Sequence, residues 1–315
     1  MGDSMFDHTA STTRSGPFGA RTGTRPPGTR MYGRLPGGLP FLSLGSGEPL
    51  VFLPGLGAHN EGPVGMERWA QALMLEPYAH SRRVWWVNRR PGLAPDATIA
   101  DLAGELAGAL RRQFGRPVDV LGMSTGGSVA LQLAVDHPDV VKRLIIVSAA
   151  YRLGERGRNA QRRVAQEVQA ERPRRAGAAA FAMLGAGPAS RRLLGVLGWL
   201  LGRSMYGKAT PDMIATIRAE DQLDLRDRLH EISAPTLVIG GERDAFYSEQ
   251  LFTQTAALIP NSQLLLYEGQ SHMGTSTSRD LVSDVLGFLD AQDIAPGAAP
   301  GRSIRVSRRR DRATD

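Results

Sequence analysis

The stretch Val118–Gly127, VDVLGMSTGG, runs from an apolar segment directly into a serine that is flanked by glycines. The apolar residues before Gly122 favour a buried strand, and the aliphatic segment after Gly127 favours a helix. Glycines on both sides of Ser124 indicate a turn so tight that nearby side chains would clash with the backbone. The stretch therefore predicts a strand, a strained turn and a helix in direct succession.

Gly122-Met-Ser-Thr-Gly126 fits the pattern G-x-S-x-G, which in a strand–turn–helix context describes a nucleophile elbow. In that geometry the serine oxygen projects above the sheet edge, near the positive end of the helix dipole. Backbone N–H groups there stabilise the oxyanion that forms when serine attacks a carbonyl carbon. Ser124 is therefore our candidate nucleophile, and the N–H of Thr125 is one candidate oxyanion donor.

A serine hydroxyl needs a base near neutral pH. Of the six histidines, His272 in YEGQSHMG follows the last predicted strand, at the sheet edge where ligands gather. The base in turn needs a carboxylate that fixes its tautomer. Asp244, just after the predicted strand TLVIGG, is our candidate, and Glu242 is the alternative. Asp119 begins a strand at the opposite edge and is rejected.

The glycine-rich segment FLPGLGAHN, residues 52–60, follows an early strand. Its position predicts that the N–H of Leu56 supplies the second oxyanion donor. The segment also places His59 at the border of the site. The predicted substrate-binding residues are Met123, His59, Trp199 and Met273. No group of histidines and carboxylates has metal-ligand spacing, so we expect no metal.

Short apolar runs alternate with amphipathic segments through most of the chain. The apolar runs are continuous, which is typical of strands covered on both faces. Predicted strands lie at residues 49–55, 83–88, 118–122, 143–148, 236–241 and 263–269, and predicted helices at 98–114, 128–138, 248–260 and 278–290. This alternation predicts an α/β fold with a doubly wound, mostly parallel sheet.

Residues 151–232 contain no convincing strand and are too many for an ordinary connection. We predict a helical cap inserted between two halves of the core, at residues 31–150 and 233–293. A lid over the site is one interpretation, and a helical subdomain without a ligand role is the other. The apolar cap residues that could face a substrate are Phe181, Met183, Leu184, Leu197, Trp199 and Leu200.

The net charge of +7 is concentrated at the two ends. Residues 1–30 contain four arginines and two aspartates, and residues 294–315 contain six arginines and two aspartates. Both ends are predicted to be disordered, because they are rich in polar residues, glycine and proline and lack periodicity. The part between them is close to neutral, so we expect no nucleic-acid partner.

The absence of cysteine and of long apolar runs excludes several classes of protein. The chain has no cysteine, which excludes disulfides and thiolate chemistry. No apolar run approaches the roughly 20 residues that span a bilayer, so we expect no stable membrane insertion. The N-terminus lacks an apolar signal core, which makes the cytoplasm the expected location. The sequence leaves the oligomeric state open.

The motifs FLPGLG, GMSTGG, GGERD and GQSH, in the order serine, acid, histidine, resemble the α/β-hydrolase superfamily over about residues 40–290. The resemblance implies that Ser124 is the nucleophile, His272 the general base and acid, and Asp244 the orienting carboxylate. It also implies an α/β-hydrolase fold with a helical cap. The sequence departs from the family at Pro54-Gly55, where His-Gly is common, and at residues 87–96, VNRRPGLAPD, where Asp-x-Arg-Gly-x-Gly-x-Ser is frequent.

These observations predict a serine hydrolase without a cofactor that acts on a small, largely apolar ester, thioester or lactone through an acyl-enzyme. The same residues would serve an acyltransferase or a carbon–carbon hydrolase. A hydrolase-like ligand receptor is the alternative from a different class. In each case the expected partner is a small molecule.

Overall fold

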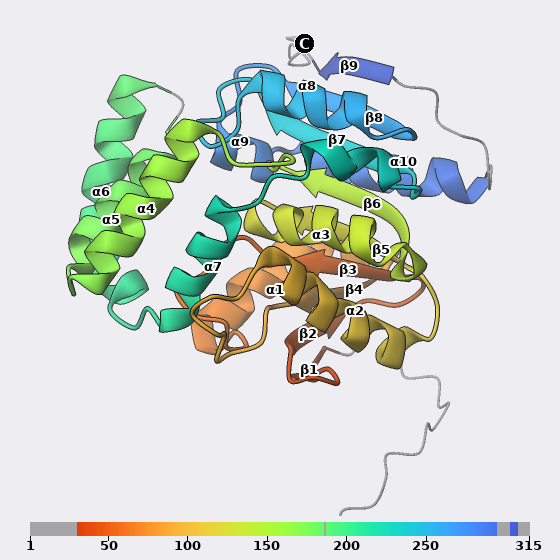
Figure 1. Ribbon diagram of the computed structural model, residues 1–315, viewed down its shortest axis with the longest axis horizontal. Coiled ribbons are helices and arrows are strands. Elements are labelled where there is room, and N and C mark those ends of the chain that lie inside the picture. Colours follow the sequence, from red (N-terminus) through yellow and green to blue (C-terminus); the bar gives the residue numbers. More distant parts are fainter. Residues whose placement is uncertain (1–29, 186, 295–302, 308–315) are drawn as a thin grey trace, which may run out of the picture.

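The computed structural model describes residues 30–185, 187–294 and 303–307. Its centre is a single twisted sheet with helices on both faces (Figure 1). Within the described residues the sheet has the strand order β1-β2-β4-β3-β5-β6-β7-β8-β9. The strands are β1 (Met31–Arg34), β2 (Pro40–Leu44), β3 (Pro49–Leu53), β4 (Arg83–Val87), β5 (Val118–Met123), β6 (Val141–Val147), β7 (Thr236–Gly241), β8 (Ser262–Tyr267) and β9 (Ser303–Ser307).

Strands β3 to β9 are all parallel to one another. Among the described residues, β1–β2 and β2–β4 are the antiparallel pairs. The helices are α1 (Gly65–Ala79), α2 (Ile99–Phe114), α3 (Thr125–Asp136), α4 (Glu155–Gln169), α5 (Pro173–Ala182), α6 (Pro188–Tyr206), α7 (Pro211–Asp221), α8 (Glu249–Leu258), α9 (His272–Ser276) and α10 (Asp280–Ile294). Two short 3-10 helices, η1 (Pro138–Val140) and η2 (Arg226–Glu231), complete the described elements.

The two faces of the sheet are covered by different helices. Residues of α2, α3 and α8 pack against one face in a large buried cluster. Residues of α1 and α10 form a second cluster with the opposite face. The prediction of a doubly wound, mostly parallel sheet is therefore confirmed.

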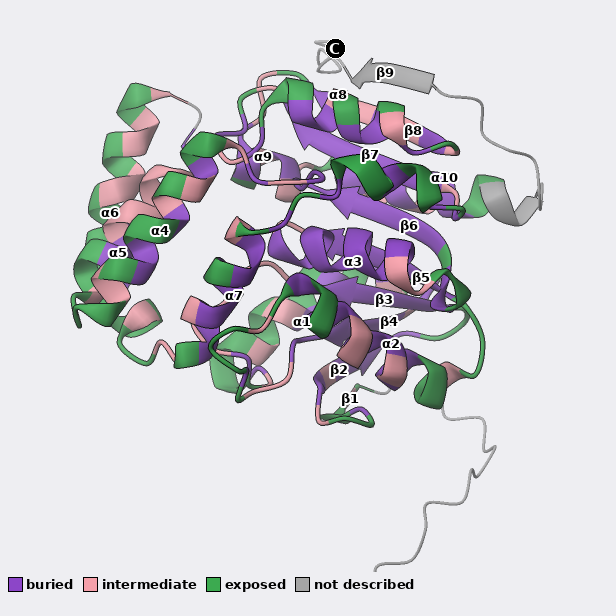
Figure 2. Cartoon of the chain, viewed as in Figure 1, coloured by how far each residue is buried: buried purple, intermediate pink, exposed green. Residues whose placement is uncertain are grey.

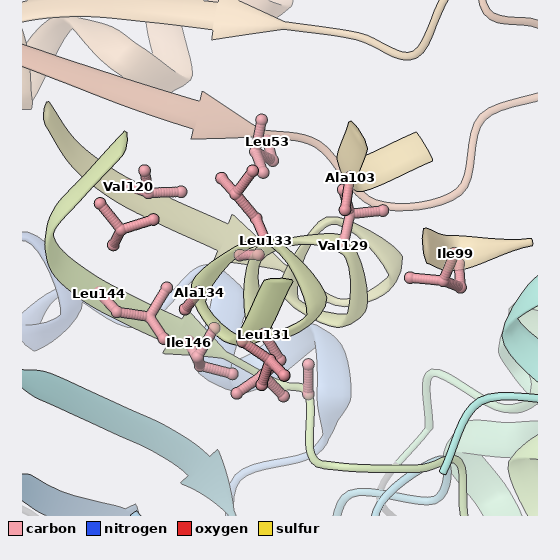
Figure 3. Close-up of a cluster of buried hydrophobic side chains, with 14 of the residues drawn as sticks. Leu53, Ile99, Ala103, Val120, Val129, Leu131, Leu133, Ala134, Leu144 and Ile146 are labelled. Atoms are coloured by element: carbon pink, nitrogen blue, oxygen red, sulfur yellow. The ribbon is translucent and has the colours of Figure 1, made fainter. Parts of the chain in front are cut away.

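Helix α3 is the most deeply buried of the core helices (Figure 2). Its aliphatic side chains pack against Leu53, Val120 and Leu144 of three adjacent strands (Figure 3). Burial of this kind stabilises a helix through roughly 25 cal/mol per Å² of apolar surface removed from water. The core therefore fixes the start of α3, and with it the turn that precedes the helix.

Helix α2 shows how the sequence sets its own ends. Thr98 accepts a hydrogen bond from the N–H of Asp101, and the Asp101 carboxylate accepts one from the N–H of Thr98, which together form a capping box. The helix ends at Gly115, which adopts the left-handed conformation with φ of 64°. The predicted helix at residues 98–114 differs from the observed one by a single residue.

Several elements were not predicted. Strands β1 and β2 lie next to glycines and prolines in segments without a continuous apolar run. Helix α1 contains Pro77 close to its end and has no side-chain cap at its start, so it lacks the usual signals.

The structure describes only part of the two terminal segments that we predicted to be disordered. Residues 1–29 of the predicted N-terminal tail lie outside the described residues. In the segment 294–315, which we predicted to be disordered, Ser303–Ser307 forms β9 and pairs in parallel with β8. The residues around β9 in this segment, 295–302 and 308–315, lie outside the described part of the chain.

Helices α4 to α7 lie between β6 and β7 in the sequence and form a helical insertion beside the core (Figure 1). They have a small hydrophobic cluster of their own, built from Val164, Ala165, Ala176, Met213 and Ile217. Leu56, in the loop after β3, packs against this cluster. The cap therefore meets the core at the carboxyl ends of the strands, where Ser124, Asp244 and His272 lie.

Candidate active site

Ser124 occupies the turn between β5 and α3 in a strained backbone conformation, with φ of 53° and ψ of −125°. Such a conformation is rare for a residue with a side chain and occurs mostly at functional sites. The flanking glycines make it possible. A side chain at Gly122 would collide with the carbonyl oxygen of Gly126, and one at Gly126 would collide with the carbonyl oxygen of Leu53. The turn is therefore as tight as the sequence predicts.

The three residues chosen as nucleophile, base and acid meet at the carboxyl ends of the strands. The Oγ atom of Ser124 lies 3.0 Å from Nε2 of His272. The other ring nitrogen, Nδ1, lies 2.7 Å from Oδ2 of Asp244. Ser124 follows β5, Asp244 follows β7 and His272 begins α9 after β8, so the fold brings together segments that are 148 and 28 residues apart.

The Asp244 carboxylate is held from the side away from His272. Its Oδ1 atom accepts hydrogen bonds from the N–H groups of Phe246 (2.8 Å) and Tyr247 (3.2 Å). The Asp244 side chain is fully buried, and the ring of Phe246 lies 4.6 Å from the His272 ring. These contacts fix the carboxylate and the imidazole relative to each other. A carboxylate on Nδ1 keeps that nitrogen protonated and leaves Nε2 free to accept the serine proton.

The loop after β3 lies beside Ser124 and is held by a buried arginine. Arg89 donates hydrogen bonds to the carbonyl oxygens of Pro54 (3.3 Å) and Gly55 (3.0 Å) and to Oδ1 of Asn60 (3.3 Å). The carbonyl and N–H of one trans peptide point in opposite directions. Because Arg89 holds the Gly55 carbonyl, the N–H of Leu56 points away from the arginine.

Arg89 is a buried charge near the site that is not part of the proposed triad. Burial lowers the pKa of Arg89 to about 10, an effect that the negative charges of Glu220 and Asp212 oppose. The guanidinium therefore stays protonated at neutral pH. Asp212, at the start of α7, accepts hydrogen bonds from the N–H groups of Gly92 and Leu93.

Glu220 of α7 is also buried, and its side chain connects the helical insertion to the turn at Ser124. The carboxylate accepts hydrogen bonds from the hydroxyls of Thr125 (2.8 Å), Ser128 (2.7 Å) and Tyr247 (3.1 Å) and from Nε2 of Gln161 (2.9 Å). Thr125 and Ser128 lie in the first turn of α3, where a negative charge also interacts favourably with the helix dipole.

A cavity of about 370 Å³ opens between the core and the cap, with Ser124 and His272 in its wall. Its remaining lining is largely apolar. Its apolar and aromatic side chains are Ala160, Val164, Ala180, Phe181, Leu184, Met205, Tyr206 and Met213 of the cap and Leu56, Met123, Phe246 and Met273 of the core. Gln161, Ser276 and Thr277 add uncharged polar groups. None of the lining residues in the described part of the chain is an aspartate, glutamate, lysine or arginine.

Comparison with known proteins identifies the family. The family model described as the alpha/beta hydrolase family matches residues 50–285. The chain belongs to the alpha/beta hydrolase family. The protein is therefore a hydrolase, as the motifs predict.

The relatives and solved structures that resemble this hydrolase have different named activities. It is 27% identical to a putative carbamate hydrolase, RutD, of Serratia proteamaculans, over 60% of this chain and 72% of the relative. It is 29% identical to the pimeloyl-[acyl-carrier protein] methyl ester esterase of Vibrio cholerae, over 72% and 88% of the two chains. The crystal structure of a hydrolase from Pseudomonas aeruginosa superposes with a TM-score of 0.65 at 23% identity, covering 83% of this chain and 98% of that one.

The cavity of the hydrolase includes some of the predicted substrate-binding residues and leaves out others. Met123 and Met273 line it, and so does Leu56, the candidate oxyanion donor. His59 does not, and its Nε2 lies 3.9 Å from Oε2 of Glu67. Trp199 does not line the cavity either.

Trp199 lies on the outer surface of α6, where its ring stacks under Arg174 at 4.4 Å. Three of the other cap candidates, Met183, Leu197 and Leu200, are absent from the cavity lining as well. The sequence of α6 is apolar around most of its circumference, so it does not indicate which side faces the core.

Several polar residues around the site had no signal in the sequence. Arg89 and Glu220 lie in segments rich in charged residues, and nothing marks them as buried. The two other carboxylates considered as partners of His272 have different contacts. Glu242 accepts a hydrogen bond from the N–H of Gly269, and Asp119 forms a buried ion pair with Arg143.

Proposed function

We propose that this hydrolase cleaves a small, uncharged, largely apolar carboxylic ester, thioester or lactone through an acyl-enzyme on Ser124. The observation that carries the proposal is the chain of contacts from Ser124 Oγ through the His272 ring to Asp244, facing an apolar cavity. The relationship to a methyl ester esterase supports an ester as the scissile group.

The proposed reaction has two halves. Ser124 Oγ attacks the carbonyl carbon while its proton moves to Nε2 of His272, and an oxyanion forms. The N–H groups of Leu56 and Thr125 are the proposed donors to that oxyanion. The oxyanion then collapses, the bond to the leaving alkoxide or thiolate breaks, and Nε2 returns the proton to it.

In the second half, water attacks the acyl carbon and gives its proton to Nε2. The new oxyanion collapses, Ser124 Oγ leaves and takes the proton back, and the free acid departs. Asp244 stabilises the imidazolium in both halves. Because no oxidant, metal or cofactor is needed for these steps, the residues named supply all of the chemistry.

The composition of the cavity supports the proposed substrate class. A carboxylate buried among apolar side chains without a partner loses several kcal/mol of hydration. The lining offers no cationic partner apart from a protonated His272, whereas the thioether and aromatic side chains of Met205, Met213 and Phe181 suit an alkyl chain. The hydrolase should therefore favour neutral acyl groups over acyl groups that carry a second carboxylate.

The first test replaces the nucleophile. Ser124→Ala should lower the rate of p-nitrophenyl butyrate hydrolysis by at least about 10⁴-fold, while the circular dichroism spectrum and the melting temperature stay unchanged. Wild-type enzyme should hydrolyse p-nitrophenyl butyrate at least tenfold faster than the p-nitrophenyl hemiester of succinate. Full activity of the Ser124→Ala variant would refute the acyl-enzyme, and a preference for the succinate hemiester would refute the substrate class.

A further inference from the structure

The outer surface of the cap bears a large apolar patch. Helices α5 and α6 form a hairpin, residues 173–206, which we call the cap hairpin. Along α6 several large side chains are exposed, and Figure 2 shows few buried residues on this helix. The exposed fraction is 71% for Leu193, 60% for Val196 and 61% for Leu200. Monomeric proteins rarely expose so many large apolar side chains together unless the surface binds something.

The packing of the hairpin explains why these side chains point outward. Gly198 and Gly202 of α6 are buried against Gly177, Pro173 and Arg174 at the start of α5. A side chain at Gly198 would collide with the carbonyl oxygen of Gly177. Gly198 and Gly202 therefore face α5, and Leu193, Val196 and Leu200 remain on the outer side of α6.

The hairpin and its flanks are also strongly cationic. Residues 172–210 contain six arginines, one lysine and no acidic residue. The rest of residues 31–293 carries a net charge of −6. Although the region between the two chain ends is nearly neutral in total, its positive charge is gathered on the element that exposes the leucines.

A groove next to the apolar patch collects much of this charge. It has a volume of about 850 Å³, and its lining includes Arg172, Arg174, Arg175 and Arg203. Among the described residues, Glu171 is the one acidic residue in its lining. Trp199 lies at the junction of groove and patch, with the Arg174 guanidinium over its ring. Arginine side chains, Trp199 and exposed leucines are therefore neighbours on the surface of the cap hairpin.

We propose that the cap hairpin binds the surface of an anionic phospholipid bilayer. Helices that lie in the bilayer interface combine an apolar face with arginine or lysine on the polar side. Each basic residue near an anionic leaflet contributes about 1 kcal/mol, and tryptophan prefers the headgroup level. The leucines of α6 would enter the boundary of the acyl chains, and the arginines of the groove would contact lipid phosphates.

Two other occupants fit the surface less well. A second copy of the chain, related by a two-fold axis, would bring two cationic hairpins face to face, which like charges oppose. A membrane-spanning role does not fit, because no helix among the described residues is long and apolar enough to cross a bilayer. The proposal is therefore surface binding.

The bound orientation has a consequence for the cavity. Tyr206, at the end of α6, lines both the arginine groove and the active-site cavity. Met205 beside it lines the cavity and is also exposed. Binding through the hairpin would hold the active-site cavity close to the lipid, from which an apolar ester can enter without crossing water. The binding itself does not depend on catalysis.

The test measures co-sedimentation of the full chain with sucrose-loaded vesicles of phosphatidylcholine alone or with 30% phosphatidylglycerol. At 0.1 M NaCl the partition coefficient should be at least tenfold higher with phosphatidylglycerol, and 0.5 M NaCl should remove this difference. Arg174→Glu/Arg203→Glu should weaken partitioning at least tenfold, because each arginine contributes about fivefold. Leu193→Ser/Leu200→Ser should weaken it by a similar factor.

Matched controls separate the hairpin from other basic and apolar segments. Arg308→Ser/Arg309→Ser/Arg310→Ser removes three arginines near the C-terminus, and Met66→Ser/Leu73→Ser removes two exposed apolar side chains of α1. Both controls should bind vesicles within threefold of wild type. Ser124→Ala should do the same, so failure of the catalytic proposal would leave this result intact.

Three outcomes would overturn the proposal. The first is equal binding to both kinds of vesicle. The second is loss of binding in the C-terminal control with no loss in the hairpin variants. The third is a dimer in sedimentation velocity that Leu193→Ser/Leu200→Ser abolishes, without vesicle binding by the wild type. Hydrolysis of p-nitrophenyl butyrate in solution should be unchanged in both hairpin variants, which would show that they remain folded.

Discussion

Single residues far from the reacting atoms determine the geometry of the site. Arg89 illustrates this, because it contacts no residue of the proposed triad and yet holds two carbonyl groups of the loop that carries Leu56. Its neighbour Arg90 forms a partly exposed ion pair with Glu105 and donates a hydrogen bond to the carbonyl oxygen of Gly92. The sequence shows two adjacent arginines, and only the fold distinguishes the buried one from the exposed one.

We expect Arg89→Met to lower kcat by about 10² to 10³, the effect of losing one oxyanion donor, with a much smaller change in KM. Arg90→Met should leave kcat within a factor of two, because exposed ion pairs contribute little. Steady-state kinetics with p-nitrophenyl butyrate, together with melting temperatures, would measure both effects. A rise in KM at constant kcat in Arg89→Met would show that the arginine serves substrate binding and not the oxyanion loop.

At the scale of elements, the positions of glycines in α6 determine how the cap is built. Gly198 lies where α6 crosses α5, whereas an added side chain at Gly195 would make only ordinary contacts, the nearest at 3.7 Å. Periodicity does not reveal this difference, since both glycines sit among leucines. For the same reason the sequence indicated helices in this region but not which side of α6 each residue occupies, and Trp199 lies outside the cavity at Ser124.

The same substitution at these two glycines should have opposite effects. Gly198→Ala should lower the free energy of unfolding by about 1–3 kcal/mol through overpacking, and Gly195→Ala should raise it by about 0.5–1 kcal/mol through helix propensity. Urea denaturation followed by circular dichroism would measure both. Equal effects of the two variants would contradict the described crossing of α5 and α6.

At the scale of the whole molecule, the sequence predicted the parts of the fold that follow from local pattern. The buried strands and the capped helix α2 are visible as apolar runs and end signals. The edge strands β1 and β9 are not, because their pairing depends on neighbours that only the folded sheet provides. The partners of Glu220 come from three separate segments and had no local signal for the same reason.

The proposed triad could be chosen from sequence because of sheet topology. In a parallel sheet, residues that follow strands collect at one edge, so Ser124, Asp244 and His272 were candidates without knowledge of any distance. The central claim is that these three side chains, from three distant segments, act as one unit.

The most direct measurement is covalent labelling by a fluorophosphonate, in which the serine oxygen displaces fluoride from phosphorus. Peptide mass mapping should locate one adduct, on Ser124, and the labelling rate constant should fall by at least about 10³-fold in His272→Ala. An adduct on a different residue, or an undiminished rate in His272→Ala, would contradict the account.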